Sequence, residues 1–264
     1  MGERSAAIGR AVRAGLAGWT PGVRACAAAL VVAFALCLLP LRPGLAFLAA
    51  LKFILAATLA IGALYRAAFA GPAGWNGLRW GREEWRLLAV LALSSVILAV
   101  VGAVLLVVVG GVSLGVVRMT APDIDTLSIE AWRGALSGPG GMLATLMTLA
   151  AIWLMIWVFL RLSLAPAATV EAGKVQVLSA FERTRGAIPR LAVAGLLLAA
   201  PAVILSWLLA YAVSRAGGLD GSLVARLVNP ALLFFYFIPV WTAALVDVYR
   251  RHVPSVRLPG STRP

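Results

Sequence analysis

The stretch that decides the fold runs from residue 142 to residue 213. It contains an apolar run, MLATLMTLAAIWLMIWVFL (142–160), a mostly amphipathic segment, RLSLAPAATVEAGKVQVLSAFERTRG (161–186), and a second apolar run, LAVAGLLLAAPAVILSWLLAYAV (191–213). A helix that crosses a bilayer needs about 20 apolar residues. Each run is close to that length. The pattern therefore predicts two membrane-spanning helices joined by a segment at the membrane surface.

The composition places the whole chain in the same class. Of its 264 residues, 62% are hydrophobic and 12% are charged, whereas a soluble domain has about 25% charged residues. Inside a bilayer each backbone polar group must find a partner within the protein, which favours helices. We therefore predict a single all-α transmembrane domain over residues 1–264, with short tails and no separate soluble domain. The abundance of Ala and Gly, and of Arg over Lys, suggests GC-rich coding and a bacterial source.

Six apolar stretches predict a polytopic protein with six transmembrane helices and short interfacial helices. They cover residues 25–40, 45–65, 87–110, 142–160, 190–213 and 231–249. The apolar pattern of the third continues to residue 117, so that this helix tilts, bends at Gly110–Gly111 or leaves the membrane there. We expect Asn229–Pro230 to open the sixth and Pro239 to interrupt it. The N-terminus could pass for a signal peptide, but only PLRPG joins the first two runs, which favours a retained helical hairpin.

The basic residues of the connecting segments predict the orientation. Seventeen of the 23 basic residues fall on one side of the six spans, five fall on the other, and one lies inside a span. The seventeen are Arg4, Arg10, Arg13, Arg24, Arg66, Arg79, Arg82, Arg86, Arg161, Lys174, Arg183, Arg185, Arg190, Arg250, Arg251, Arg257 and Arg263. Because positively charged connections remain in the cytoplasm, we expect both termini to be cytoplasmic and the protein to lie in a bacterial inner membrane. The net charge of +13 then reflects orientation and contact with anionic lipid rather than nucleic acid.

A helical wheel over residues 174–185 predicts a short helix at the membrane surface. Val177, Leu178 and Phe181 fall on one side of it, and Lys174 and Arg185 flank that apolar face, where long side chains can reach lipid phosphates. A helix packed over the cytoplasmic ends of the spans fits the same pattern. Together with the preceding cytoplasmic loop, the segment predicts lipid-headgroup contacts by five cations: Arg79, Arg82, Lys174, Arg183 and Arg185.

Part of this segment resembles a known group of proteins. Ser179, Ala180, Thr184, Arg185 and Gly186 match a Ser-Ala-x-x-x-Thr-Arg-Gly-like helix that leads into a span, and RLSLAP matches the turn that ends the preceding span. In these features the chain is similar to uncharacterised bacterial multipass membrane proteins, which are similar to the membrane domain of some glycerophosphodiester phosphodiesterases. The resemblance implies a helical membrane domain. The phosphodiesterase barrel with its metal-binding carboxylates is absent from this sequence, so the resemblance implies no activity.

Residue types that carry enzyme chemistry are few. His252 is the single histidine, and there is no HExxH or paired-cysteine motif for a metal. Asp123 and Asp125 have the spacing of two metal-loop carboxylates, but acids also suit the start of a helix. Glu83 and Glu84 are interpreted as helix-capping residues for the same reason. We therefore expect a non-enzymatic protein with no catalytic residue, no metal site and no cofactor.

Lys52 is the one charge deep inside a predicted span. A central lysine costs roughly 2.5–3.5 kcal/mol on insertion, and position 52 lies about 10 Å from the outer end of its helix, so we expect its amine to snorkel outward. The favoured function is a non-enzymatic inner-membrane protein that organises or regulates membrane or partner proteins. Its expected partners are membrane lipids, anionic ones above all, other proteins or further copies of the chain. The alternative is a small transporter or channel that uses Lys52 and the kinked helices.

Overall fold

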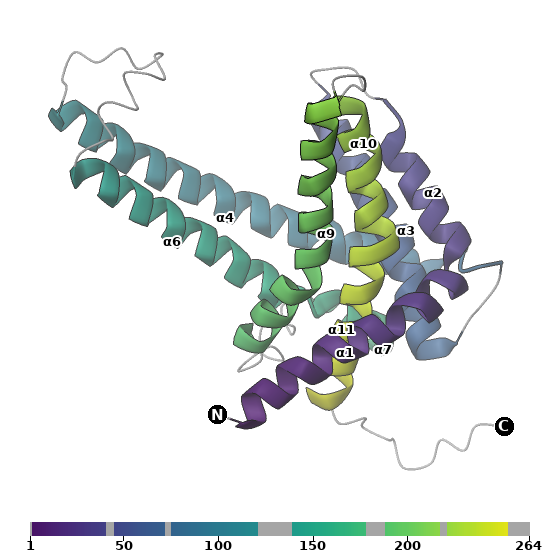
Figure 1. Cartoon of the computed structure of the whole chain (residues 1–264). Helices are drawn as coiled ribbons and strands as arrows, with labels where there is room; N and C mark the ends of the chain where they lie inside the picture. Colours follow the sequence, from purple (N-terminus) through teal and green to yellow (C-terminus); the bar gives the residue numbers. More distant parts are fainter. Residues whose placement is uncertain are drawn as a thin grey trace. The chain divides into compact units, whose positions relative to one another are not determined.

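The computed structural model describes residues 2–40, 45–71, 75–120, 139–177, 188–216 and 221–252, and these ranges contain helices and no strands (Figure 1). The helices are α1 (Gly2–Ala25), α2 (Ala27–Leu38), α3 (Ala46–Ala70), α4 (Arg82–Thr120), α6 (Pro139–Leu162), α7 (Ala165–Ala172), α9 (Ile188–Ala216), α10 (Gly221–Leu232) and α11 (Ile238–His252), with a π-helical turn, η1 (Leu233–Phe237), before α11.

Several of these helices are long and apolar enough to cross a bilayer. Within the described ranges five stretches qualify, and the bent pair of α1 and α2 makes a sixth if it counts as one span. The five are Phe47–Ala70, Arg82–Met119, Gly141–Ala172, Ile188–Arg215 and Ala225–Arg251. The chain is therefore an all-α, multi-pass membrane protein, and this part of the sequence prediction is confirmed.

The contacts within the chain form two units. The first combines Met1–Ala92 with Leu162–Pro264, and the second is Leu93–Arg161. The candidate site and the residues that support it all belong to the first unit.

The first predicted span, residues 25–40, has a different form in the structure. The helix at this position, α2, has 12 residues, which gives it a length of roughly 18 Å, against roughly 30 Å for a hydrocarbon core. It follows α1, a helix of 24 residues, and the two meet beside Cys26 at an angle of 87°. The sequence prediction missed α1 because its mixture of small, basic and apolar residues forms no continuous apolar run. The two helices are a broken span or a re-entrant pair rather than one straight span.

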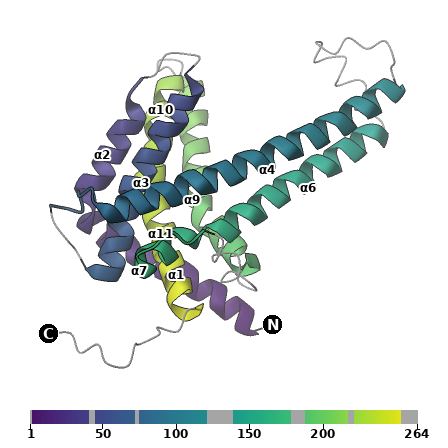
Figure 2. The same cartoon turned by 180° about the vertical axis from the view of Figure 1, so that it is seen from behind.

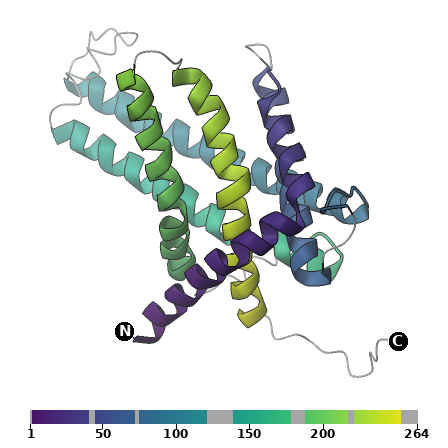
Figure 3. The same cartoon turned by 45° about the vertical axis from the view of Figure 1, so that its right-hand side comes forward.

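Two glycines allow α1 to lie directly against α11, across which it passes in Figure 3. A Cβ atom on Gly18 would come within 2.5 Å of the Cβ atom of Ala243, and one on Gly15 within 2.9 Å of the carbonyl oxygen of Val240. Residues at i and i+3 share a helix face, and small residues on such a face permit the close approach of helices in membranes. α1 is therefore packed against the other helices of the first unit and is not a helix that contacts the membrane surface alone.

Small residues also form the contact between α2 and α3. Ala29 and Ala33 of α2 share one buried cluster with Ala56, Ala60 and Ala63 of α3. Alanine side chains let the two backbones come close, as in other membrane helix pairs. Further members of the cluster are Cys26, Leu30, Leu59, Leu64, Phe234 and Ile238. The last two belong to η1 and α11, so the final span closes the same core.

The last span is one continuous helical stretch. The sequence predicted that Asn229–Pro230 opens it, whereas α10 begins at Gly221 and Pro230 lies inside the helix. At η1 the amide of Ile238 donates to the carbonyl oxygen of Leu233, which is the i−5 bond of a π-helix. Tertiary packing here overrides the helix-opening tendency of an Asn-Pro pair.

Pro239, which we expected to interrupt this span, leaves the helix intact. Proline has no N–H to offer the carbonyl oxygen four residues earlier, which belongs to Phe235. That oxygen accepts a hydrogen bond from Nε1 of Trp19 in α1 at 2.7 Å. A side chain from the N-terminal helix thus replaces the missing backbone donor.

The second unit is a pair of neighbouring helices, the later part of α4 and the part of α6 up to Arg161 (Figure 2). α4 continues through Gly110–Gly111 to Thr120 without a helical break. A Cβ atom on Gly102 would lie 3.7 Å from the methyl carbon of Met155, an ordinary contact between the two helices. Most large apolar side chains of this unit are exposed, as expected where lipid rather than protein surrounds a helix pair.

The connection after α6 also differs from the prediction. The expected helix over 174–185 does not begin at Lys174, because residues 174–177 are not helical, and the rest of it lies outside the described ranges. A helix precedes it instead: α7 has Pro166 in its first turn and ends at Gly173, whose φ is 62°. A proline in the first turn and a glycine in the left-handed conformation suit the start and the end of a short helix.

Candidate functional site

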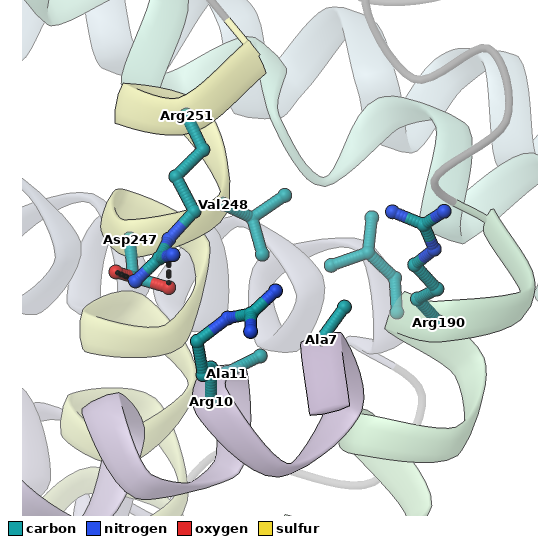
Figure 4. A pocket seen from close by; sticks show the side chains of 8 residues that line it. Ala7, Arg10, Ala11, Arg190, Asp247, Val248 and Arg251 are labelled. Carbon is teal, nitrogen blue, oxygen red and sulfur yellow. Dashed lines mark hydrogen bonds and ion pairs between the residues drawn. The ribbon is translucent and has the colours of Figure 1, made fainter. Parts of the chain in front are cut away.

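One pocket in the first unit is lined by charged side chains from three helices (Figure 4). Arg10 comes from α1, Arg190 from the first turn of α9, and Asp247 and Arg251 from the last turns of α11. The pocket has a volume of about 220 Å³. Its remaining lining is apolar: Ala7, Ala11, Leu191 and Val248. Three segments that are far apart in the sequence therefore bring basic residues to one hollow.

Asp247 and Arg251 form a hydrogen-bonded ion pair within this pocket. Nε and Nη2 of Arg251 donate to the two carboxylate oxygens of Asp247, each at 2.9 Å. This bidentate arrangement is the strong form of an arginine–carboxylate pair. The exposed Arg10 and the half-buried Arg190 form no hydrogen bond or ion pair with another described residue (Figure 4). With three arginines and one aspartate, the described lining residues carry a net charge of +2.

The local sequence explains why α9 begins at this pocket. Pro189 is the second residue of the helix, where its missing N–H removes no helical hydrogen bond. The first N–H groups of a helix lack intrahelical acceptors, so this end carries a partial positive charge. Arg190 adds a full charge at the same place. On the opposite wall, Ala7 and Ala11 of α1 are too short to fill the space.

The predicted headgroup cations lie outside this pocket. Arg79 is exposed between α3 and α4, Arg82 is exposed at the start of α4, and Lys174 is exposed after α7. None of the three lines the pocket. Arg183 and Arg185 lie outside the described residues.

The segment with Arg79 and Arg82 also exposes three indole rings. Trp75, Trp80 and Trp85 are 76%, 41% and 61% exposed. The rings of Trp80 and Trp85 meet edge to face, with their centroids 5.6 Å apart. Exposed tryptophans beside arginines are typical of the membrane–water interface. We refer to residues 75–85 as the Trp–Arg segment.

A buried ion pair fixes the Trp–Arg segment to α3. Arg66 of α3 and Glu84 of α4 pair with each other, and their residues are only 6% and 1% exposed. Nη2 of Arg66 also donates to the carbonyl oxygen of Gly77 at 2.9 Å. This pair was not predicted from the sequence, where Arg66 was assigned only to the basic residues that set orientation.

Glu84 has a second role at the start of α4. Its Oε2 atom accepts a hydrogen bond from the backbone N–H of Gly81 at 2.7 Å. A glutamate at the third helical position that reaches back to the residue before the helix is one half of a capping box. The capping interpretation of Glu84 is confirmed. Its neighbour Glu83 is exposed.

Lys52 stabilises the end of α2. Its Nζ atom donates to the carbonyl oxygens of Cys37 at 3.1 Å and of Leu39 at 2.8 Å. The last carbonyls of a helix lack intrahelical donors, so the amine supplies a cap. A hollow of about 360 Å³ lies beside Lys52, and apart from Lys52, Asn229 and Cys37 its lining is apolar. The amine therefore faces α2 rather than a polar chamber.

Comparisons with protein-family models, curated proteins and solved structures find no match for this chain. Among the residues that the structure describes, no group of three or more His, Cys, Asp or Glu side chains could hold a metal ion. Asp123 and Asp125 lie outside the described ranges, as does the side chain of His252.

The charged pocket was not predicted from the sequence. Arg10, Arg190 and Arg251 all belonged to the set of residues predicted to be cytoplasmic, and that shared side was the one available signal. Their convergence depends on how α1 packs against α9 and α11. Since α1 itself was not predicted as a helix, the pocket could not be assembled from the sequence.

Proposed function

We propose that this chain is a non-enzymatic protein of a bacterial inner membrane that organises anionic lipid, and through it partner proteins, at the cytoplasmic surface. The observation that carries the proposal is the Trp–Arg segment, in which exposed indoles and guanidiniums are fixed to α3 by the buried pair of Arg66 and Glu84. Tryptophan favours the headgroup layer. A basic residue near an anionic surface contributes about 1 kcal/mol to lipid attraction.

The ends of the helices in the first unit support the proposed orientation. Arg190 lies at the start of α9 and Arg251 at the end of α11, and both line the same pocket. Nη2 of Arg250 donates to the carbonyl oxygen of Ala68, so the ends of α11 and α3 lie together. Arginines of the predicted cytoplasmic set thus gather where these helices end. Arg215 lies at the opposite end of α9, as expected for a residue of the other set.

A transporter or channel is supported less well. That alternative depends on Lys52 as an intramembrane charge available to a substrate, but the amine already donates to two carbonyl oxygens of the α2 end. The neighbouring hollow offers few polar groups, whereas a substrate pathway through a membrane is usually marked by ionisable side chains facing a water-filled cavity.

Native mass spectrometry of the protein in mild detergent tests the proposed function. The variant R79Q/R82Q removes two exposed cations and leaves Arg66 and Glu84 in place. We expect it to retain fewer anionic lipids than the unaltered protein, with retention of zwitterionic lipids unchanged. The matched variant R215Q/R226Q removes two exposed arginines from the other predicted side. Equal lipid retention by R79Q/R82Q and the unaltered protein contradicts the proposal.

A further inference from the structure

We infer that the pocket between α1, α9 and α11 is a discrete site for one phosphate group carried on an amphipathic molecule, with Arg10 and Arg190 as its ligands. The inference goes beyond general attraction of the Trp–Arg segment to lipid, because it concerns a single bound molecule. That the bound molecule is a lipid rests on the proposed function, which places this end of the first unit at the cytoplasmic headgroup layer.

The charges in the pocket favour an anion. Among the described residues of the lining, Asp247 is the one with an acidic side chain, and Arg251 donates to both of its carboxylate oxygens. Arg10 and Arg190 therefore keep their donors available within the described part of the chain. A guanidinium presents several N–H donors in a planar fork that matches phosphate oxygens. Two such forks on facing walls, with Arg251 beside them, suit a group that has three or four oxygens.

The volume and the apolar lining of the pocket further restrict the chemical class of the ligand. A volume of about 220 Å³ holds a phosphate with several attached atoms, since one water occupies about 30 Å³ in the liquid. Leu191, Val248 and the two alanines give this space an apolar side. A phosphate ester with a hydrocarbon part uses both sides of such a pocket, whereas a free inorganic ion uses only the arginines. Nucleic acid would need a longer run of contacts than one pocket provides.

The start of α9 adds to the attraction. Leu191 lines the pocket from the first turn of this helix, together with Arg190. The partial positive charge of a helix start stabilises a nearby phosphate. The arginine cluster and the helix start therefore act in the same direction. Together they distinguish this pocket from the mostly apolar hollow beside Lys52.

The test compares R10Q/R190Q with R79Q/R82Q, which removes the same number of charges outside the pocket. Protein in nanodiscs of phosphatidylcholine is supplied with a small fraction of phosphatidic acid or phosphatidylglycerol, and bound lipid is counted by native mass spectrometry. We expect one tightly held anionic lipid on the unaltered protein and also on R79Q/R82Q, which should lose only the weakly held lipids that the Trp–Arg segment attracts. In R10Q/R190Q its affinity should fall about ten- to a hundredfold, as expected for the loss of one or two charge-assisted hydrogen bonds.

A second arm separates a lipid headgroup from a soluble phosphate. Inorganic phosphate and glycerol 3-phosphate are titrated into the phosphatidylcholine nanodiscs, and thermal stabilisation is measured. Stabilisation that depends on Arg10 and Arg190, without retention of anionic lipid, assigns the site to a soluble phosphate compound. If neither arm shows an effect that depends on these arginines, the inference is wrong. Because Arg10 is exposed, R10Q alone repeats the test if the double variant does not fold.

The outcome for this pocket is separable from that for the proposed function. Loss of the single lipid in R10Q/R190Q with unchanged bulk retention in R79Q/R82Q supports the pocket and contradicts the role of the Trp–Arg segment. The reverse result supports the segment and overturns the pocket. Equal loss of the single lipid in both variants also overturns the pocket, because it shows dependence on total charge alone.

Discussion

The indole nitrogen of Trp19 donates a hydrogen bond to the carbonyl oxygen of Phe235, 2.7 Å away. This oxygen is the regular helical acceptor for the residue at position 239, which is proline. The ring of Trp19 also meets that of Tyr236 edge to face, with a centroid distance of 5.4 Å. The N-terminal helix therefore completes the hydrogen bonding of the last span at its π-helical turn.

Replacing Trp19 with Phe should destabilise the protein. The change keeps an aromatic ring but removes the N–H donor, and the loss of one hydrogen bond that leaves a carbonyl unsatisfied costs about 1–3 kcal/mol. Unfolding by SDS in mixed micelles measures the effect. A double-mutant cycle with P239A identifies the cause, because an alanine at 239 restores the backbone N–H. Trp19→Phe should cost clearly less in the P239A background, and an equal cost in both backgrounds contradicts the link to Pro239.

Adding a methyl group to Gly18 should destabilise the packing of α1 on α11. The new Cβ would lie 2.5 Å from that of Ala243, and overpacking of this kind costs about 1–3 kcal/mol. Gly9 is the matched control on the same helix, since no atom lies within 4 Å of its added Cβ. Gly9→Ala should be neutral or stabilise the helix by about 0.5–1 kcal/mol. In the pair G18A/A243G the stability should recover in part.

Replacing Lys52 with Met should destabilise the end of α2. The variant loses two hydrogen bonds from a charged donor to carbonyl oxygens. This loss should exceed the gain from removing a charge inside the membrane, so that the free energy of unfolding falls by about 1–2 kcal/mol. Thermal unfolding in detergent measures the change. Lys174 is the other lysine and is exposed, so Lys174→Met is the matched control and should have an effect within about 0.5 kcal/mol. A more stable Lys52→Met variant would show that the cost of the charge dominates.

Replacing Glu84 with Gln should destabilise the protein more than the substitutions of Trp19, Gly18 or Lys52. The variant keeps an oxygen acceptor for the N–H of Gly81 but leaves the buried Arg66 without its counter-charge. Breaking a buried ion pair on one side costs about 3–5 kcal/mol. The neighbouring Glu83 is exposed, and Glu83→Gln should change the stability by less than about 0.5 kcal/mol. Equal stability of the two variants is incompatible with a buried pair.

Cysteine labelling with a membrane-impermeant reagent should confirm the proposed orientation. In a background without Cys26 and Cys37, a cysteine at position 83 should be labelled only after the membrane is opened, since basic connections remain cytoplasmic. A cysteine at position 125 should be labelled in intact cells. External labelling at position 83 contradicts the orientation but leaves the helical fold unaffected.

The sequence predicted the class of protein and its longer spans, because an apolar run of membrane length has few structural solutions. Glu84 was predicted as a cap because acidic residues at the start of a helix are a local pattern. Features that depend on distant parts of the chain were missed: α1 has no continuous apolar run, and its helical position follows from glycines that fit against α11. The start of the last span was placed late, at Asn229–Pro230, because the packing of α10 against α9 and α2 is not visible in a local window.

The bond from Trp19 to Phe235 joins residues that are 216 positions apart, which has a consequence for biosynthesis. A ribosome adds roughly 5–20 residues each second, so the acceptor is made roughly 10–40 s after the donor. For that interval the helix with Gly15 and Gly18 exists without its partner and must be accommodated by lipid or by the insertion machinery. Completion of the first unit therefore waits for the end of translation, and a chain truncated before residue 235 should leave its N-terminal helix open to proteolysis.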